Sequence, residues 1–585
     1  PMTVKKMLIA NRGEIAIRIL RAAADIGIAS VAIYAEDESQ SLHVAKADEA
    51  AALPGRGVPA YLDGAAILEL AQDMNCDAIH PGYGFLSENS KFALSCAEAG
   101  IAFVGPSMEI LEVFGDKAAA RDLAQRNGVP VLPGSDGAAD GSTAEAFFDA
   151  HGATMIKAVG GGGGRGMRAV LDKDKISGAL HICQAEALQA FGNGDVFVEK
   201  LLPAPRHIEV QIIGDGSGAI SHLGERECSI QRRHQKLVEM APAPGLEQVL
   251  RERITAAAVK MAEAVDYGNL GTFEFLVEGE EFFFIEANPR LQVEHTVTEE
   301  VWGVDLVQTQ IALTGGATLS DLGLRQADLG PPRGQAMQVR INMETIDKDG
   351  NVHPTGGVLE VFEMPSGPGI RVDTFGYAGY STIPSYDSLL AKLVAHTNGN
   401  NFAALSQKTY RALCECRIGG FSTNIGFLQN LLQNDEFRTG NIATTFIANH
   451  LGTLVDGVDH QRRYFEAADG LAEDKNLVGV KVDASDPLAV LAHGKSTALP
   501  EDSENINYSG PDGTTAIAAP MLGTVVSLDV TEGDSVYPGR QVLIMEAMKM
   551  QHVIEAEISG VVRQLPVQPG AVSYTHLTLP TNREV

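Results

Sequence analysis

The sequence is short of the residues that would cross-link it or hold a zinc ion. Only six cysteines are spread over its 585 residues. Four of them stand alone, and the single close pair, Cys414 and Cys416, has no second pair near it. The sequence therefore indicates neither a disulfide framework nor a zinc site.

Long apolar runs and positive charge are also scarce. No apolar run approaches the roughly 18 residues of a membrane span, and no signal peptide stands out, so we expect a cytoplasmic protein. The 75 acidic residues outnumber the 45 lysines and arginines, which gives a formal charge of −30. Such a charge argues against nucleic acid or an anionic membrane as a partner. An anionic substrate would need a local basic pocket.

The composition is otherwise that of a globular protein. Hydrophobic residues make up 45% of the chain, and its length suffices for three or four domains. Apolar residues 4–10, a helical pattern over 15–24 and an apolar run over 30–34 predict a βαβ unit with a parallel sheet. A Gly/Pro-rich loop over residues 80–89 follows a further apolar pair, and such loops often carry function.

A glycine run over residues 160–164, continued by Gly166, is the most prominent feature of the N-terminal half. A strand-like stretch with Lys157 precedes it, and a loop without side chains lets backbone N–H groups close over phosphates. No Gly-Lys-Ser/Thr follows, so the run is not a Walker loop, and ATP would need another fold. A simple linker is the alternative.

Positive charge gathers at one place in this acidic chain. Arg232, Arg233, His234 and Lys236 stand almost side by side. This cluster could form the basic pocket that an anionic substrate requires. The alternative for any one of these residues is a place on a solvated, charged helix.

Two strand-like stretches carry carboxylates. Glu274 stands between aromatic residues, while Glu286 and Asn288 share one face of the next stretch. Carboxylates on an apolar strand are costly unless they are paired or bound to a metal. Two carboxylates and an amide oxygen suit Mg²⁺. A structural ion pair is the alternative.

A predicted hairpin near the C-terminus places one lysine at its turn. Residues 541–545 and 552–555 alternate apolar and polar side chains, as half-buried strands do, so Lys549 would project into solvent. An ordinary surface lysine is the bland alternative. However, residues 547–550, Ala-Met-Lys-Met, resemble the biotin-attachment motif of biotin-dependent carboxylases. The resemblance implies covalent biotin on Lys549.

Residues 4 to about 446 resemble biotin carboxylase. The resemblance rests on residues 11–16, 80–89, 160–168, 225–236, 286–299 and 386–388. It implies an α/β and α+β chain with a Rossmann-like domain (1–115), an ATP-grasp domain (116–330) with a mobile lid at about 130–204, and a C-terminal carboxylase domain (331–446). A linker (447–513), an all-β biotinyl domain of the hammerhead type (514–572) and an atypical tail (573–585) would follow.

The resemblance also implies roles for individual residues. Those similar to nucleotide-binding residues are Lys117, Lys157, Gly162, Gly163, Gly164, Gly166, Glu199, Lys200, His207, Gln231 and His234. The implied Mg²⁺ (or Mn²⁺) ligands are Glu274, Glu286 and Asn288, and the implied bicarbonate pocket is Lys236, Arg290, Gln292, Val293 and Glu294. Glu294 would be the general base, and Arg340 would face the ureido oxygen of biotin, with Arg290 and Lys236 as further catalytic residues.

An argument from geometry supports the pocket. If residues 290–294 form a strand, Arg290, Gln292 and Glu294 point to the same side. Bicarbonate is a poor nucleophile until it is deprotonated, so a carboxylate must lie within reach of it.

The expected activity is the first half-reaction of an acyl-CoA carboxylase, which consumes ATP and bicarbonate. The alternatives are a pyruvate, other 2-oxoacid or urea type of carboxylase, another ATP-grasp ligase with a lipoyl-like appendage, and a carrier or scaffold with an inactive carboxylase half. The implied partners are a carboxyltransferase, as a separate subunit or a missing downstream domain, a biotin protein ligase and a second copy of the chain.

The tail departs from the internal repeat of the biotinyl domain. Residues 523–526 and 532–536 recur loosely as residues 560–563 and 568–572, but no counterpart of residues 542–545 follows. We expect the native carrier sequence to end near Val572, which leaves a sheet edge open. The alternative is that residues 575–579 supply the last strand.

Overall fold

The structure is a computed structural model that describes residues 4–135, 137–159, 166–191, 193–465, 514–519, 523–547, 550–556, 558–573 and 578–582. The chain divides into two compact units, residues 1–460 and 461–585, and each is described by itself. Among the helices of these ranges, none combines the length and the apolar character that crossing a bilayer requires.

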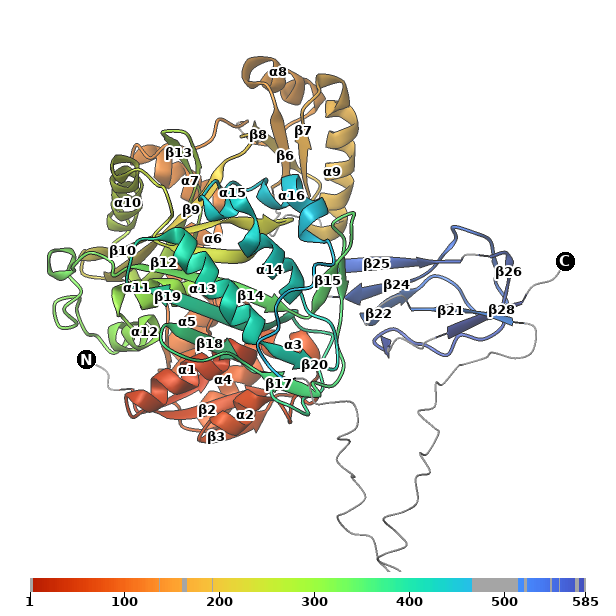
Figure 1. The fold of residues 1–585 in the computed structure, drawn as a ribbon, viewed down its shortest axis with the longest axis horizontal. Helices are drawn as coiled ribbons and strands as arrows, with labels where there is room; N and C mark the ends of the chain where they lie inside the picture. Colours follow the sequence, from red (N-terminus) through yellow and green to blue (C-terminus); the bar gives the residue numbers. More distant parts are fainter. Residues whose placement is uncertain are drawn as a thin grey trace, which may run out of the picture. The chain divides into compact units, whose positions relative to one another are not determined.

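The first unit begins with a five-stranded parallel sheet in the order β3-β2-β1-β4-β5. Figure 1 labels β2 and β3 of this sheet. Its strands are β1 (Lys6–Ile9), β2 (Ala29–Tyr34), β3 (Glu49–Ala52), β4 (Ala78–His80) and β5 (Ala102–Phe103). The helix α1 (Gly13–Asp25) connects β1 to β2, so the predicted βαβ unit is confirmed. Ile15 and Ile19 of α1 pack in one buried cluster with Ile9. The shorter helices here are α2 (Leu42–Lys46), α3 (Gly57–Leu62), α4 (Gly64–Asp73), α5 (Ser90–Glu98) and α6 (Met108–Gly115).

The centre of the first unit is an eight-stranded antiparallel sheet in the order β13-β12-β9-β10-β11-β14-β19-β18. Its strands are β9 (Arg206–Asp215), β10 (Ile220–Arg232), β11 (Gln235–Ala241), β12 (Gly268–Glu278), β13 (Glu281–Asn288), β14 (Gln335–Asn342), β18 (Ile370–Thr374) and β19 (Leu389–Thr397). Val238 of β11 lies opposite Val339 of β14, so this sheet continues across the domain boundary predicted at residue 330. Residues from both sides of that boundary therefore meet on one surface.

Helices cover this sheet with apolar side chains. Ile254 of α10 packs in one cluster with Phe273 of β12, and Leu428 of α14 packs in another with Leu393 of β19. The helices are α7 (Lys117–Arg126), α10 (Gln248–Glu263), α11 (His295–Trp302), α12 (Leu306–Thr314), α13 (Phe402–Glu415), α14 (Ile425–Gln433), α15 (Asp435–Arg438) and α16 (Phe446–Leu454). Short strand pairs join them: β15 (Glu344–Ile346) with β16 (Val352–Pro354), and β17 (Val361–Glu363) with β20 (Arg417–Gly419).

The end of this unit corrects one predicted boundary. The linker was expected from residue 447, but α16 continues to Leu454, and its side chains Ile447 and Leu454 are buried in the cluster that contains Leu393. Residues 447–460 therefore belong to the first unit, because an apolar helical face keeps them on the core. The predicted tether at 500–513 lies outside the described residues.

The predicted lid segment forms a small sheet in the order β7-β6-β8 beside two helices (Figure 1). Its elements are β6 (Thr154–Ala158), β7 (Met167–Val170), β8 (Val196–Lys200), α8 (Gly141–His151) and α9 (Ile176–Phe191). The β6 and β7 strands pair antiparallel on either side of the glycine run, of which residues 160–165 lie outside the described residues. Gly166 has φ +67°, and a Cβ there would lie 2.8 Å from the Cβ of Ala158. Only glycine fits this position without a shift.

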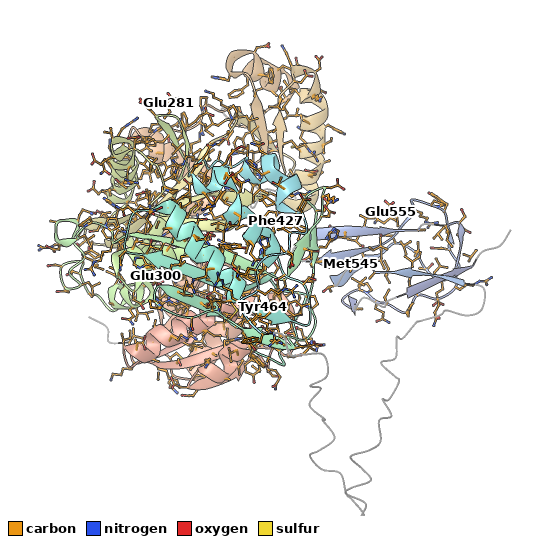
Figure 2. All side chains as sticks on the ribbon, in the orientation of Figure 1. Glu281, Glu300, Phe427, Tyr464, Met545 and Glu555 are labelled. Carbon is orange, nitrogen blue, oxygen red and sulfur yellow. The ribbon has the colours of Figure 1, made fainter. Side chains whose placement is uncertain are left out.

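The second unit contains two four-stranded antiparallel sheets, β21-β28-β26-β23 and β25-β24-β22-β27. Its strands are β21 (Thr514–Ala518), β22 (Gly523–Leu528), β23 (Ser535–Val536), β24 (Gln541–Ala547), β25 (Met550–Glu555), β26 (Gly560–Val562), β27 (Val572–Ser573) and β28 (Thr578–Asn582). The predicted hairpin is present, since Ala547 of β24 pairs with Met550 of β25. Figure 2 labels Met545 and Glu555 on its two strands. Lys549, at its turn in the sequence, lies outside the described residues.

The tail of the second unit corrects a second expectation. We expected a missing strand after Val572, but β28 lies between β21 and β26, with Leu579 opposite Ile517 and Asn582 opposite Val561. The tail thus supplies a strand, as the alternative held, although at 578–582 rather than 575–579.

Candidate active site

Lys236 on β11 lies at the centre of the candidate site. Its Nζ lies 2.7 Å from Glu209, 2.7 Å from Glu294 and 3.2 Å from Glu274. Burial alone would lower the pKa of Lys236, but the Cys228 thiol and these carboxylates hold it well above its usual range. A permanently charged ammonium group therefore stands among three buried carboxylates. A solvated, charged helix was the alternative for Lys236 and its basic neighbours. The structure places Lys236 in a hairpin of β10 and β11 instead.

Glu294 lies between two cations. It is the residue before α11, its side chain is 1% exposed, and its second carboxylate oxygen lies 3.2 Å from Nη2 of Arg340. Burial would raise the pKa of Glu294, but Lys236, Arg340 and Arg226 hold it well below its usual range. The neighbouring Glu209 has a raised pKa because it is buried and faces Glu294. Carboxylates whose pKa values are pushed apart are typical of acid–base sites.

The segment before Glu294 is not the strand that the sequence argument assumed. β13 ends at Asn288, and residues 289–294 form a loop that leads into α11. Pro289 has no N–H to donate to a strand neighbour, which explains the end of the strand. The side chains of Arg290 and Gln292 nevertheless lie together beside Glu274. Arg290 donates to Gln292 Oε1 at 2.8 Å, and Gln292 donates to Glu274 Oε1 at 3.2 Å.

The predicted magnesium ligands lie on the paired strands β12 and β13. Glu274 is directly opposite Glu286, and Asn288 donates to Glu274 at 2.8 Å. Burial would raise the pKa of Glu274, but Lys236 and His207 hold it well below its usual range. Two carboxylates and an amide oxygen at one edge of the sheet are the hard oxygen donors that suit Mg²⁺. The donor set therefore fits the ion.

The predicted nucleotide-binding residues fall in two groups. On the central sheet, His207 lies 2.7 Å from Glu274, and Gln231 lies 3.1 Å from the other ring nitrogen of His207. Lys117 at the start of α7 lies 3.6 Å from Glu286. On the lid sheet, Lys157 of β6 forms an ion pair with Glu199 of β8. The other predicted residues in described parts are His234 at the turn between β10 and β11, Lys200 at the end of β8, and Gly166 just before β7.

Three predicted residues of the glycine run, Gly162, Gly163 and Gly164, lie outside the described residues, as does Lys549. Val293 lies in the loop before α11, and its carbonyl accepts a hydrogen bond from Lys392.

Sequence reasoning missed several residues that hold the site together. Arg226, fully buried, donates to Glu209 and to Gln211, Thr298 and Thr272. Arg340 donates a hydrogen bond of 2.6 Å to Glu239. A signal was present for Glu209 and Gln211, because they alternate with apolar residues on a strand whose polar positions face the site. The same signal marks Glu239, which stands between Val238 and Met240 on β11, whereas no comparable pattern marks Arg226.

Four family models match most of the chain, with residues 450–514 outside them. Residues 3–111 match the family described as biotin carboxylase, N-terminal domain, residues 116–322 the ATP-binding domain of the carbamoyl-phosphate synthase L chain, and residues 338–449 the biotin carboxylase C-terminal domain. Residues 515–575 match the family described as biotin-requiring enzyme.

The curated relatives include pyruvate carboxylases. This chain is 48% identical to that of Staphylococcus aureus over 451 residues, which is 76% of this chain and 39% of that protein. It is 49% identical to the human mitochondrial pyruvate carboxylase over 451 residues, 76% of this chain and 38% of that protein. The chain thus spans about two fifths of the length of these relatives.

Solved structures extend the likeness to three dimensions. The biotin carboxylase domain of a single-chain bacterial carboxylase is 47% identical, with a TM-score of 0.69 over 77% of this chain and 98% of that one. The biotin carboxylase domain of the 2-oxoglutarate carboxylase of Hydrogenobacter thermophilus, a dimer with MgADP and bicarbonate, is 40% identical, with a TM-score of 0.74 over 78% of this chain and 100% of that one. A single-chain long-chain acyl-CoA carboxylase is 39% identical, with a TM-score of 0.69 over 100% of this chain and 51% of that one.

The fold and the site define an ATP-dependent ligase of the ATP-grasp type. More specifically, the chain belongs to the biotin carboxylase family and carries a biotinyl carrier domain in the same polypeptide. The matching family models are those of an ATP-binding domain and of a biotin-requiring enzyme, and magnesium accompanies ADP in the Hydrogenobacter thermophilus structure.

Proposed function

We propose that this chain uses ATP and bicarbonate to carboxylate biotin that is attached to its own Lys549. One observation carries the proposal: Glu294 is buried beside the cations Lys236 and Arg340, which keep its carboxylate ionised. An ionised carboxylate between two fixed cations can receive a proton from a bound anion.

In the proposed reaction, bicarbonate lies against Lys236, Arg290, Gln292 and the backbone of Val293. Glu294 accepts the proton of bicarbonate, which makes the oxygen of the anion a better nucleophile. That oxygen forms a bond to the γ-phosphorus of ATP as the bond from this phosphorus to the bridging oxygen of ADP breaks. The fixed cations offset the charge that develops on the phosphoryl group.

Glu274, Glu286 and Asn288 would hold Mg²⁺, which neutralises phosphate charge when it is bound. Lys117, Lys157, His207, Gln231, His234 and the lid residues are the proposed nucleotide contacts. Biotin, when bound, would supply the nitrogen that accepts the carboxyl group. The carboxyphosphate formed in the first step would release phosphate, and the biotin nitrogen would give up its proton. Arg340 is the proposed contact of its ureido oxygen: burial would lower the pKa of this arginine, but Glu239 and Glu294 raise it, so the charge is permanent.

The test is ADP release from the purified chain with MgATP, with and without bicarbonate and free biotin. We expect release that requires bicarbonate and increases with added biotin. A folded sample that binds ATP but shows neither dependence would contradict the proposed function and support the inactive scaffold or another ATP-grasp ligase.

We further propose a 2-oxoacid, with pyruvate as the first choice, as the final acceptor of the carboxyl group. Pyruvate carboxylases about half identical to this chain favour this acceptor over the acyl-CoA that the sequence suggested. The proposed partners are a carboxyltransferase, a biotin protein ligase and a second copy of the chain. The cytoplasm is the proposed compartment.

The acceptor prediction uses the biotinylated chain charged with [14C]bicarbonate. One sample receives the carboxyltransferase of a pyruvate carboxylase together with pyruvate, and the other receives an acyl-CoA carboxyltransferase together with its acyl-CoA. We expect the label to pass from the chain to pyruvate in the first sample and much less label to reach the acyl-CoA in the second. In the matched control, Lys549→Arg should bind no avidin and carry no label, yet release ADP with free biotin as the wild type does. Label transfer to the acyl-CoA alone would overturn the 2-oxoacid proposal.

A further inference from the structure

A fully buried lysine lies beside the proposed site without a role in the reaction described above. Lys392 on β19 has a side chain that is 0% exposed. Its Nζ donates to the carbonyl oxygen of Val293 at 3.0 Å, and lies 3.0 Å from Glu14 and 3.7 Å from Asp373. Lysine is almost never buried in this way unless it is paired. Lys392 therefore joins the loop before Glu294 to charges on α1 and β18.

The loop that Lys392 contacts has little backbone support of its own. Residues 289–294 belong to neither β13 nor α11, and so lack the ladder of hydrogen bonds that would fix a strand. The Val293 carbonyl belongs to the peptide group that joins Val293 to Glu294. A hydrogen bond to this oxygen therefore sets the plane of the peptide from which Glu294 projects.

His295 holds the preceding carbonyl in the same way. Its Nδ1 lies 2.7 Å from the carbonyl oxygen of Gln292. Since a carbonyl can only accept, Nδ1 carries the proton. Burial and the nearby Lys392 hold the pKa of His295 well below its usual range, so the ring is neutral. Two buried side chains thus hold two successive carbonyls of the loop.

Further charges anchor the helix that follows Glu294. Glu299 of α11 forms ion pairs with Arg18 of α1 at 2.6 Å and with Arg371 of β18 at 2.8 Å. Figure 2 labels the next residue, Glu300. Arg371 also lies 2.9 Å from Asp373, which closes the link to Lys392. We call this set, Lys392, Arg371, Arg18, Glu14, Asp373 and Glu299, the buried charge ring. Cations and carboxylates alternate along this set, so each buried charge has a partner of opposite sign. Arg18 and Arg371 also lie 2.8 Å from Asp305 and 3.4 Å from Glu300, respectively, which are partly exposed.

We propose that Lys392 is a positioning residue for the bicarbonate pocket, which it serves by fixing the Val293 carbonyl and with it the direction of the Glu294 carboxylate. The inference rests on the proposed function. It assigns to Lys392 no contact with substrate. Its effect should spare nucleotide binding, because its side-chain partners Val293, Glu14 and Asp373 are not proposed nucleotide-binding residues.

The variants Lys392→Met and Lys392→Gln separate positioning from packing. Both remove the charge, but glutamine keeps an N–H group that can donate to Val293. We expect Lys392→Met to lose about 100-fold in kcat/KM for bicarbonate, the size of effect that a displacement near 1 Å has. Lys392→Gln should recover a large part of this loss, and the KM for ATP should stay near the wild-type value in both.

The matched control is Arg371→Met, which removes another cation of the buried charge ring without contact to the loop. It should lose as much thermal stability as Lys392→Met but keep bicarbonate kinetics within about threefold of wild type. Should Lys392→Met fail to fold, the Glu14→Gln, Lys392→Met double variant leaves the net charge of the set unchanged and is compared with Glu14→Gln alone.

Equal losses of kcat/KM for bicarbonate in Lys392→Met and Arg371→Met would overturn the positioning role. So would a Lys392→Gln variant that is as stable as Lys392→Met but recovers none of this kcat/KM. Normal bicarbonate kinetics in Lys392→Met would overturn it too and leave the proposed function intact. A wild type without biotin-stimulated, bicarbonate-dependent turnover would overturn both.

Discussion

Replacing Glu294 with glutamine is expected to remove the bicarbonate-dependent release of ADP that free biotin stimulates. Glutamine keeps the shape of the side chain but cannot accept the proton of bicarbonate. Loss of a positioned general base costs about 10²–10⁴-fold in rate. Steady-state ADP release at saturating MgATP, with bicarbonate and biotin varied, measures the loss in kcat, and equilibrium binding of ATP shows that the nucleotide site is intact.

The matched control for this prediction is Glu281→Gln. Glu281 opens β13, is exposed, and is labelled in Figure 2. We expect wild-type kinetics from it, since a surface substitution far from the chemistry changes little. A Glu294→Gln variant that still turns over at the wild-type rate would show that another group accepts the proton.

Replacing Lys236 with methionine is expected to reduce both stability and activity. The change leaves Glu209, Glu274 and Glu294 without the cation that lies within 3.2 Å of all three. Removal of one partner from a buried charge cluster costs about 3–5 kcal/mol of unfolding free energy. Bicarbonate-dependent turnover should disappear, since Lys236 is also the proposed anchor of the anion. Denaturant unfolding and ADP release measure the two effects.

Two further variants test the reason for this loss. Lys348→Met removes an exposed lysine and should change the unfolding free energy by less than about 0.5 kcal/mol. The Glu209→Gln, Lys236→Met double variant removes one of the stranded carboxylates and should regain part of the stability but none of the activity. A double variant no more stable than Lys236→Met would contradict the charge-cluster explanation.

The features predicted best from the sequence are those with a local pattern. The apolar runs and the helix between them gave the parallel βαβ unit, and alternation around residues 541–555 gave the β24–β25 hairpin. Glu274 and Glu286 were predicted to act together, and they face each other across β12 and β13. In each case the period of the side chains reports the element directly.

The contacts that join distant segments could not be read from any local pattern. Lys392 and Val293 are 99 residues apart, and Arg18 and Glu299 are 281 apart. Each looks like an ordinary residue of its own strand or helix until the fold brings the segments together. The expectation that Arg290, Gln292 and Glu294 share one side holds only on a strand, and β13 ends before Pro289, so these residues lie in a loop instead.

The tail shows the opposite failure. A broken internal repeat predicted an open edge, yet β28 pairs with both β21 and β26. Strand pairing depends on backbone hydrogen bonds and on a pleated surface that several sequences can fill, so a sequence that departs from a repeat can still occupy its place.

The most direct test of the account is to follow the carboxyl group itself. The purified chain is incubated with MgATP, [14C]bicarbonate and free biotin, and the product is trapped as its stable methyl ester. We predict that the amount of labelled N-carboxybiotin equals the extra ADP that is released when biotin is added. The Glu294→Gln variant should form no labelled N-carboxybiotin. Biotin-stimulated ADP release without label in biotin would contradict the account, because it would mean that the site hydrolyses ATP without transferring the carboxyl group.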